Sequence, residues 1–220
     1  MYFKRKIDSA LDAWLKKEDK FPALLVGIRQ CGKTETIKEF AKRNGLQLIE
    51  LNFWTNPEYC LDFNGKLDIE TIINNISLRF PNIKIEPTKT LIFFDEIQDC
   101  PKARLSFKSF KNNSKYNVIG SGSYLGINGY IKGDDTPAPT GYENIFHMKT
   151  MDFEEFLWAL GYSEEQINLL INYFNKKMAI PENIHNLYKE IFLKYICLGG
   201  FPKVVKEYLQ NFYFILRLLN

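Results

Sequence analysis

Long apolar segments are absent from this 220-residue chain. No stretch approaches the ~20 consecutive apolar residues that a membrane-spanning helix needs, so we expect no membrane span. Residues 4–6 are basic, and the N-terminus shows neither a long apolar core nor a small-residue cleavage pattern. We therefore expect no secretory signal and a cytoplasmic protein.

The chain has few cysteines, and its positive and negative charges are nearly balanced. The four cysteines form no C-x-x-C pair and no tight cluster with either histidine: Cys31, Cys60, Cys100, Cys197, His147 and His185. This spacing argues against a zinc site and a disulfide framework, and it fits a reducing compartment. With 29 basic and 26 acidic residues, the net charge of +3 is too small to indicate a nucleic-acid binder, so DNA stays open as a partner without support from charge.

What the chain does contain is a phosphate-binding sequence pattern. Residues 27–34 fit G-x-x-x-x-G-K-[ST], and each position is a candidate nucleotide contact: Gly27, Ile28, Arg29, Gln30, Cys31, Gly32, Lys33 and Thr34. An apolar run at 23–26 precedes the pattern and a helix-forming stretch at 35–42 follows it. In this context the loop amides can face phosphates, Lys33 can reach the outer phosphates and the Thr34 hydroxyl can ligate Mg²⁺. The chain should bind a nucleoside triphosphate.

A second pattern supplies acids. Residues 91–96 are an apolar run that ends in Asp95 and Glu96, which is typical of a strand buried on both faces that ends at a polar cleft. Asp95 is the candidate metal-shell residue, and Glu96 is placed to activate an attacking water. The alternative is a strand that ends in a solvated acidic turn, continued by Gln98 and Asp99.

Strand-like and helix-like segments alternate over the first 150 residues. Apolar runs predict strands at 23–26, 46–53, 90–94, 116–120 and 145–149, and the intervening periodicity predicts helices at 7–15, 35–42, 69–79 and from Pro101 onward. Asp68 is the expected N-cap of the third helix. We expect loops at 54–64 and 126–141. The alternation predicts an α/β fold with a parallel, doubly wound sheet and a ligand at the carboxyl ends of its strands.

Small hydroxyls follow the strand predicted at 116–120. Ser121, with Ser123 second, should lie at the same edge as Thr34 and Asp95 and sense the outermost phosphate or its attacking water. The alternative is a serine and glycine turn with no nucleotide contact. From Met151 the pattern changes to helices, so we expect a core over 1–150 and a small helical lid over 151–220.

Five motifs in order resemble one family. They are the loop at 27–34, residues 91–98, the turn at 122–126, residues 151–157 and the Gly-Gly-Phe-Pro sequence at 199–202. Together they resemble prokaryotic AAA+ ATPases whose ATPase core precedes a C-terminal domain of unknown function. The resemblance implies a P-loop NTPase fold of AAA+ type, with ATP and Mg²⁺ as ligands and a helical lid. It also implies an extra strand between the strand that precedes the loop at 27–34 and the strand that ends in the acid pair.

In related ATPases a Gly-x-Pro turn in the lid lies near the adenine. The resemblance therefore implies that Gly200 and Pro202 lie near the adenine here. The alternative for this turn is a helix C-cap. Family members continue well beyond this length, so we expect the chain to be truncated after the core and an incomplete lid. The candidates for an arginine finger are Arg104 and Arg79, and a solvated helix face is the alternative for both.

The function that we expect is hydrolysis of ATP to ADP and phosphate with Mg²⁺, coupled to a conformational change on a macromolecular partner. Glu96, Lys33 and Ser121 are the expected catalytic residues, and Thr34 and Asp95 the expected metal ligands. The alternatives are a nucleotide-gated switch with little hydrolysis, or a small-molecule phosphotransferase. A homo-oligomer that supplies an arginine finger between subunits also remains open.

Overall fold

The computed structural model describes residues 1–112, 115–123 and 141–218. Nearly all of the loop predicted at 126–141 lies outside the described residues. The chain divides into two compact units. The α/β unit consists of Ile7–Arg29 and Lys33–Met148, and the helical unit consists of Met1–Lys6, Gln30–Gly32 and Lys149–Asn220. The phosphate-loop tip thus groups with the helical unit.

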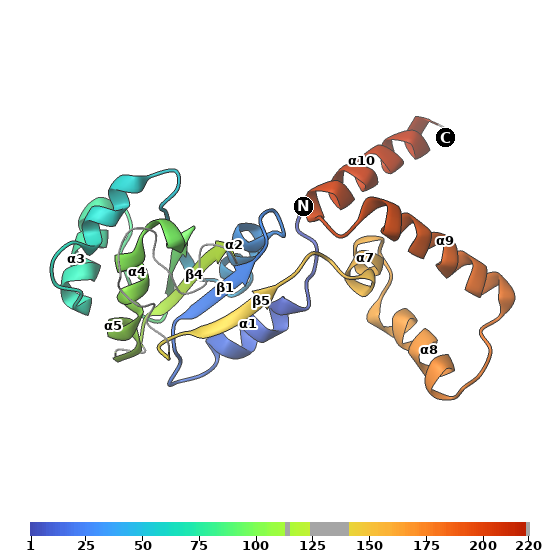
Figure 1. Ribbon diagram of the computed structural model, residues 1–220, viewed down its shortest axis with the longest axis horizontal. Coiled ribbons are helices and arrows are strands. Elements are labelled where there is room, and N and C mark those ends of the chain that lie inside the picture. The colour runs from blue at the N-terminus through green and yellow to red at the C-terminus, as the bar shows by residue number, and fades with distance from the viewer. Residues whose placement is uncertain (113–114, 124–140, 219–220) are drawn as a thin grey trace. The chain divides into compact units, whose positions relative to one another are not determined.

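The α/β unit contains a five-stranded parallel sheet of order β2-β3-β4-β1-β5 (Figure 1). Its strands are β1 (Ala23–Gly27), β2 (Gln47–Asn52), β3 (Thr90–Asp95), β4 (Asn117–Ser123) and β5 (Asn144–Met148). This arrangement confirms the predicted P-loop NTPase fold. β4 lies between β1 and β3, which carry the phosphate loop and the acid pair, as the family resemblance implies.

Helices cover both faces of the sheet (Figure 1). They are α1 (Ile7–Leu15), α2 (Lys33–Arg43), α3 (Ile69–Arg79), α4 (Pro101–Leu105) and α5 (Phe107–Asn112). Helices α3 to α5 share one apolar core with alternate residues of the strands, among them Leu24 and Phe94. On the other face α2 packs on β1, β3 and β4, and α1 packs on α2, with the ring of Trp14 against that of Phe40. Because β1 and β3 are buried on both faces, they can be apolar throughout.

Local signals predicted several boundaries well. The α1 helix and the α3 helix occupy the predicted ranges, and the Asp68 side chain accepts the Thr71 N–H at 2.9 Å as the N-cap of α3. The helix predicted from Pro101 is instead two short helices. Between them the Ser106 hydroxyl donates to the Ala103 carbonyl oxygen at 2.6 Å, a side-chain bond that competes with helix continuation.

Three other boundaries differ from prediction. The segment predicted as a loop at 54–64 contains a 3-10 helix, η1 (Pro57–Phe63), which buries Phe63 in the core. A second 3-10 turn, η2 (Ile97–Asp99), follows the acid pair. Strand β4 continues to Ser123, so Ser121 lies in the strand and not in a turn after it. Its pairing with β1 through Ser123 explains the extension.

The helical unit consists of α7 (Phe153–Ala159), α8 (Glu164–Asn175), α9 (Glu182–Leu198) and α10 (Pro202–Leu218). Asp152 and Ser163 each complete a capping box, at the starts of α7 and α8. A small apolar core joins the helices through Phe156, Ile191 and Val205. Among the residues that the structure describes, no helix has the length and apolarity to cross a membrane.

Candidate functional site

The phosphate loop joins β1 to α2. Gly27 ends the strand, and Lys33 and Thr34 open the helix. Two residues between them have left-handed backbone conformations, Gln30 with φ 64° and Gly32 with φ 99°. Left-handed residues interleaved with ordinary ones turn successive N–H groups to one side, which forms an anion-binding concavity. The loop therefore has the backbone shape that phosphate binding requires.

Lys33 turns back onto its own loop. Its side chain is buried, and Nζ donates to the carbonyl oxygens of Gly27 at 3.1 Å and of Ile28 at 3.0 Å. These bonds keep the ammonium group at the base of the loop. A lysine held there is a compact point charge with several N–H donors, which suits phosphate oxygens.

The Asp95 carboxylate accepts hydrogen bonds from hydroxyl and amide groups at the carboxyl edge of the sheet. This residue is 2% exposed. Oδ2 accepts the Thr34 hydroxyl at 3.1 Å and the Asn52 amide at 3.0 Å, while Oδ1 accepts the Ser121 hydroxyl. The structure thus brings together Thr34, Asp95 and Ser121, three of the sequence-derived candidates. Asp95 is hydrogen-bonded from α2, β2 and β4, so its carboxylate is held in one orientation.

Glu96 follows with a strained backbone. Its φ and ψ of 52° and 50° are left-handed, which is uncommon for a residue other than glycine. Its side chain is also held, because Oε2 accepts the Gln98 amide at 2.6 Å. Strain of this kind persists where surrounding contacts impose it, often at functional sites. The two adjacent acids therefore lie in different surroundings, one buried among donors and one on a tight turn.

Asn52 contacts Asp95 although it is not among the site residues expected from the sequence. Asn52 ends β2 and lies opposite Asp95 in the parallel register. Besides donating to Asp95, its side-chain oxygen accepts the N–H groups of Trp54 and Thr55. The signal was available in principle, since a polar residue at the carboxyl end of a predicted strand belongs to the same edge as the acids.

Gly200 and Pro202 belong to the helical unit, and the structure gives the glycine a packing role. The N–H of Met151 donates to the Gly200 carbonyl oxygen at 2.7 Å, and a Cβ on Gly200 would lie 2.0 Å from the Met151 carbonyl oxygen. Gly199, with φ 73°, ends α9, and Pro202 begins α10. The turn therefore needs glycine for close backbone approach. Contact with adenine stays a prediction.

Both candidate arginine fingers have intramolecular partners. Arg104 pairs with the buried Glu143, with 2.6 Å between Nη2 and Oε1. Arg79 makes a two-pronged contact with Asp62, which raises the pKa of the Arg79 guanidinium. Neither side chain lies on a purely solvated helix face, and either would have to leave a carboxylate to act on a neighbouring subunit.

Comparison with known proteins places the loop and the acids in a family context. A family profile described as "AAA domain" matches residues 19–157. Among solved structures, the Walker-type ATPase PABY2304 of Pyrococcus abyssi shares 16% identity with a TM-score of 0.49, and the alignment covers 96% of this chain and 68% of that one. The Aeropyrum pernix Orc1 protein in complex with DNA shares 15% identity with a TM-score of 0.42, over 71% of this chain and 47% of that one. No curated protein sequence matches the chain.

Proposed function

The chain belongs to the AAA domain family, and from that premise we propose that it binds ATP with Mg²⁺ and hydrolyses it to ADP and phosphate. The hydrogen-bonded group around Asp95 is the observation that carries the proposal. It brings the Thr34 hydroxyl, the Asp95 carboxylate and the Ser121 hydroxyl to one edge of the sheet. Hydroxyl and carboxylate groups gathered in this way are suited to binding a metal ion and a phosphate.

The donor set fits magnesium. Mg²⁺ prefers hard oxygen ligands and usually takes one or two from protein. Thr34 and Asp95 provide a hydroxyl and a carboxylate 3.1 Å apart, so both can face one ion. Held by these two residues, Mg²⁺ would supply positive charge to offset the charge that develops on the phosphate oxygens. Lys33 would contribute its ammonium group to the outer phosphates.

Glu96 is the proposed general base. A carboxylate beside the metal-holding residue can accept the proton of an attacking water, and the amide of Gln98 fixes the orientation of its side chain. Ser121 is the proposed sensor, because it already bonds to Asp95 and can exchange this bond for one to phosphate or water. The adenine would lie by residues 200–202, in keeping with the family resemblance.

One observation favours the alternative, a nucleotide-gated switch with little hydrolysis. Arg104 and Arg79 are both engaged with carboxylates within the chain. Without an arginine at the outer phosphate, hydrolysis is slower by about 10³-fold or more. In that case bound ATP or ADP would set the arrangement of the C-terminal helices, and these would present the surface for a macromolecular partner. In a homo-oligomer, a neighbouring subunit would supply the arginine at the outer phosphate.

Phosphate release under single-turnover conditions separates the two functions. We expect Glu96→Gln to lower the rate by about 10²–10⁴-fold, the usual contribution of a general base, with ATP affinity retained. Glu70→Gln, at an exposed carboxylate in the first turn of α3, is the matched control and should leave the rate unchanged. Equal rates for Glu96→Gln and the unmutated chain would exclude Glu96 as the base. Tight ATP binding with no release by the unmutated chain would establish the switch instead.

A further inference from the structure

Arg5 links three segments of the helical unit. Its guanidinium is buried, with 4% of the side chain exposed. Nη1 donates to the carbonyl oxygen of Cys31 at 2.9 Å, and Nη2 donates to the carbonyl oxygen of Lys149 at 2.7 Å. Nε lies 3.2 Å from Oε1 of Glu155. One side chain therefore holds the phosphate-loop tip, the segment after β5 and the start of α7.

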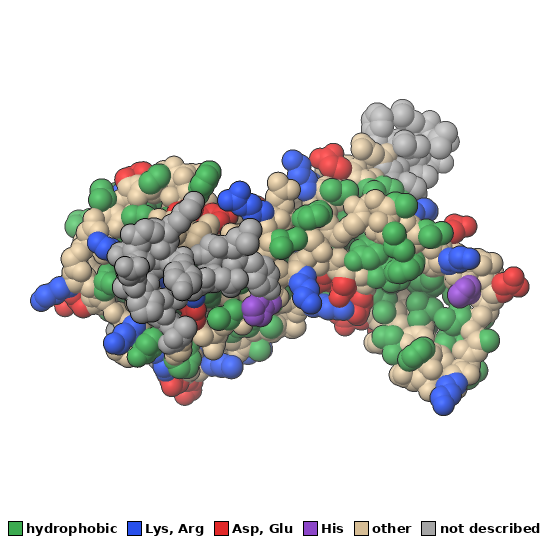
Figure 2. Space-filling model, viewed as in Figure 1, with side chains coloured by type: hydrophobic (Ala, Val, Ile, Leu, Met, Phe, Trp, Pro, Cys, Tyr) green, Lys and Arg blue, Asp and Glu red, His purple; other side chains and the backbone are tan. Residues whose placement is uncertain are grey.

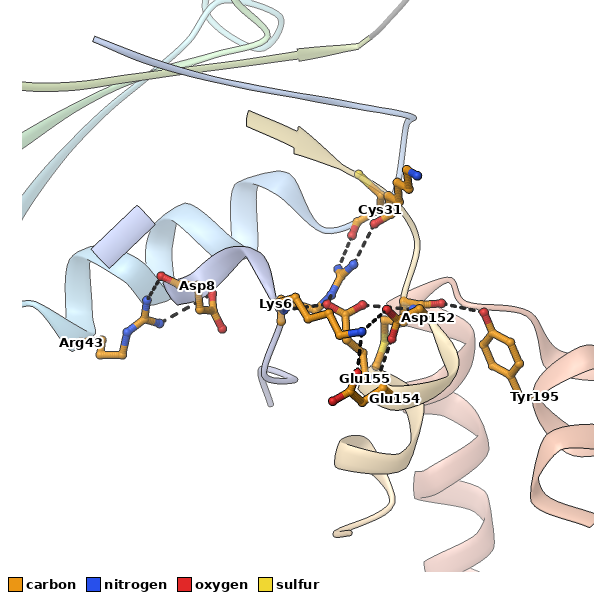
Figure 3. Close-up of polar contacts among 11 residues, drawn as sticks. Lys6, Asp8, Cys31, Arg43, Asp152, Glu154, Glu155 and Tyr195 are labelled. Carbon is orange, nitrogen blue, oxygen red and sulfur yellow. Dashed lines mark hydrogen bonds and ion pairs between the residues drawn. The ribbon is translucent and has the colours of Figure 1, made fainter. Parts of the chain in front are cut away.

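Glu155 extends this connection into α7. It is the third residue of the helix and part of the Asp152 capping box, where Oε2 accepts the Asp152 N–H at 3.1 Å. Its Oε1 also accepts the N–H of Lys6 at 2.7 Å (Figure 3). The carboxylate is only 5% exposed. Any shift of Arg5 therefore disturbs the N-terminal turn of α7 directly.

At the other end, Arg5 fixes the orientation of a loop peptide. A trans peptide is planar, so the carbonyl of one residue and the N–H of the next point in opposite directions. The described peptide bonds are all trans. Because Arg5 holds the Cys31 carbonyl, the N–H of Gly32 must point away from Arg5. Gly32 is one of the two left-handed residues that give the loop its concave shape.

Charge neutralisation alone does not account for this geometry. Pairing with Glu155 requires a positive charge and one N–H donor, which a lysine could supply. The remaining donors of the guanidinium are directed at carbonyls of two segments that are 118 positions apart in sequence, Cys31 and Lys149. The planar fork of arginine can reach all three acceptors at once, whereas a lysine ammonium lacks that fixed geometry.

We propose that Arg5 is a positioning residue that sets the Gly32 amide for phosphate and connects the phosphate loop to α7. Ligand binding at the loop changes the freedom of the Cys31 peptide, and Arg5 and Glu155 convey that change to the first turn of α7. The inference rests on the proposed binding of ATP. It adds a specific residue pair through which the helical unit responds to nucleotide.

The first test measures the affinity of the whole chain for ATP with Mg²⁺ by calorimetry. Arg5→Lys keeps the charge beside Glu155 and loses the fork, and we expect it to weaken binding by about tenfold, the effect of one lost hydrogen bond to a preorganised group. Arg5→Gln should weaken it at least as much. Arg43→Gln is the matched control, since Arg43 pairs with Asp12 at 2.9 Å in the α/β unit and should leave affinity unchanged.

The second test asks whether α7 responds. We expect ATP to slow hydrogen exchange at the amides of residues 155–157 in the unmutated chain, and to slow it no longer in folded Arg5→Lys. If Arg5→Gln does not fold, Arg5→Lys alone decides. Unchanged affinity together with an unchanged exchange response in Arg5→Lys would reduce Arg5 to a structural ion pair. Absence of ATP binding by the unmutated chain would instead remove the proposed function, before Arg5 is considered.

Discussion

The two units differ in where they place their large apolar side chains. In the α/β unit, β1 and β3 are buried throughout, and Phe94 is 0% exposed among aromatic rings. In the helical unit, large apolar side chains on α8 and α9 remain at the surface (Figure 2). Among them, Phe174 is 81% exposed. A dense core resists rearrangement, while helices with few buried contacts open at lower cost.

The same contrast holds for buried polar groups. The Asp95 group in the α/β unit is positioned by a sheet with helices on both faces, so its oxygens are fixed by strands. The Arg5 and Glu155 group in the helical unit is positioned by a short N-terminal segment, a loop tip and one helix turn. The proposed chemistry would then belong to the more rigid unit, and the proposed response to nucleotide to the more adaptable one.

Truncation of an aromatic side chain gives the largest expected difference between the units. Phe94 lies between the rings of Phe53, Phe63, Phe107 and Phe110, with centroid distances of 5.3–6.2 Å. Phe94→Ala should lower the free energy of unfolding by about 3–5 kcal/mol, because it removes buried contacts and leaves a cavity. Urea-induced unfolding followed by circular dichroism measures the effect.

Phe174→Ala is the matched change in the helical unit. Because the ring is mostly in water, the expected effect is within about 0.5 kcal/mol. A loss as large as that of Phe94→Ala would mean that the outer face of α8 is packed against something in solution, and the contrast between the units would not hold.

The turn between α9 and α10 should show an intermediate effect. Gly200→Ala places a methyl group against the Met151 carbonyl oxygen, and we expect a loss of about 1–3 kcal/mol, as for overpacking elsewhere. Hydrogen exchange should rise across α9 and α10 and stay unchanged in β1 and β3. Gly45→Ala is the control, since its methyl group meets nothing within 4 Å and only the positive φ of 63° opposes it. Equal costs for the two changes would show that close approach to Met151 is not what requires Gly200.

Local sequence signals predicted the elements whose boundaries depend on interactions between residues close in sequence. Asp68 before an apolar helix stripe gave the start of α3, and apolar runs gave all five strands of the sheet. The 3-10 helix at Pro57–Phe63 was missed because its polar and aromatic composition has no helical period, while burial of Phe63 stabilises it from outside. The break at Ser106 likewise depends on one side-chain hydrogen bond.

The residues of the candidate site were predictable from the sequence, but the hydrogen bonds among them were not. The sequence pattern indicated Lys33, Thr34 and Asp95, and parallel strand order implied that Ser121 lies at their edge. The position of Asn52 near the end of a predicted strand could place it at this edge, but its hydrogen bond to Asp95 depends on the register that sets the two residues opposite each other. Arg5 could not be found from the sequence, because its contacts with Cys31 and Glu155 join residues far apart in sequence and no spacing rule applies to them.

A smaller effect than that of Gly200→Ala is expected from a change of pH. Burial raises the pKa of Asp152, but the Lys6 ammonium and the backbone N–H of Glu155 outweigh it, so the pKa lies below its ordinary value of 3.8. A lowered pKa in the folded state means that the contribution to stability is complete above the ordinary carboxyl range and is lost as pH falls through the lowered pKa. Half of the side chain is exposed, so we expect less than about 1 kcal/mol.

Thermal unfolding of the unmutated chain and of Asp152→Asn, at pH 6 and at pH 3, measures the contribution of the Asp152 carboxylate to stability. The difference between the two proteins should shrink at the lower pH, because the carboxylate is then partly protonated. A difference that grows on acidification would show that the charge of Asp152 does not stabilise α7.

Calorimetric titration of the chain with ATP, in the presence of Mg²⁺ and again with EDTA, tests the central claim most directly. We expect saturable binding that weakens without Mg²⁺, and loss of binding in folded Lys33→Ala, since this change removes the ammonium group held at the base of the loop. Absence of binding by the folded, unmutated chain, or equal affinity in Lys33→Ala, would contradict the assignment of this loop as the phosphate site.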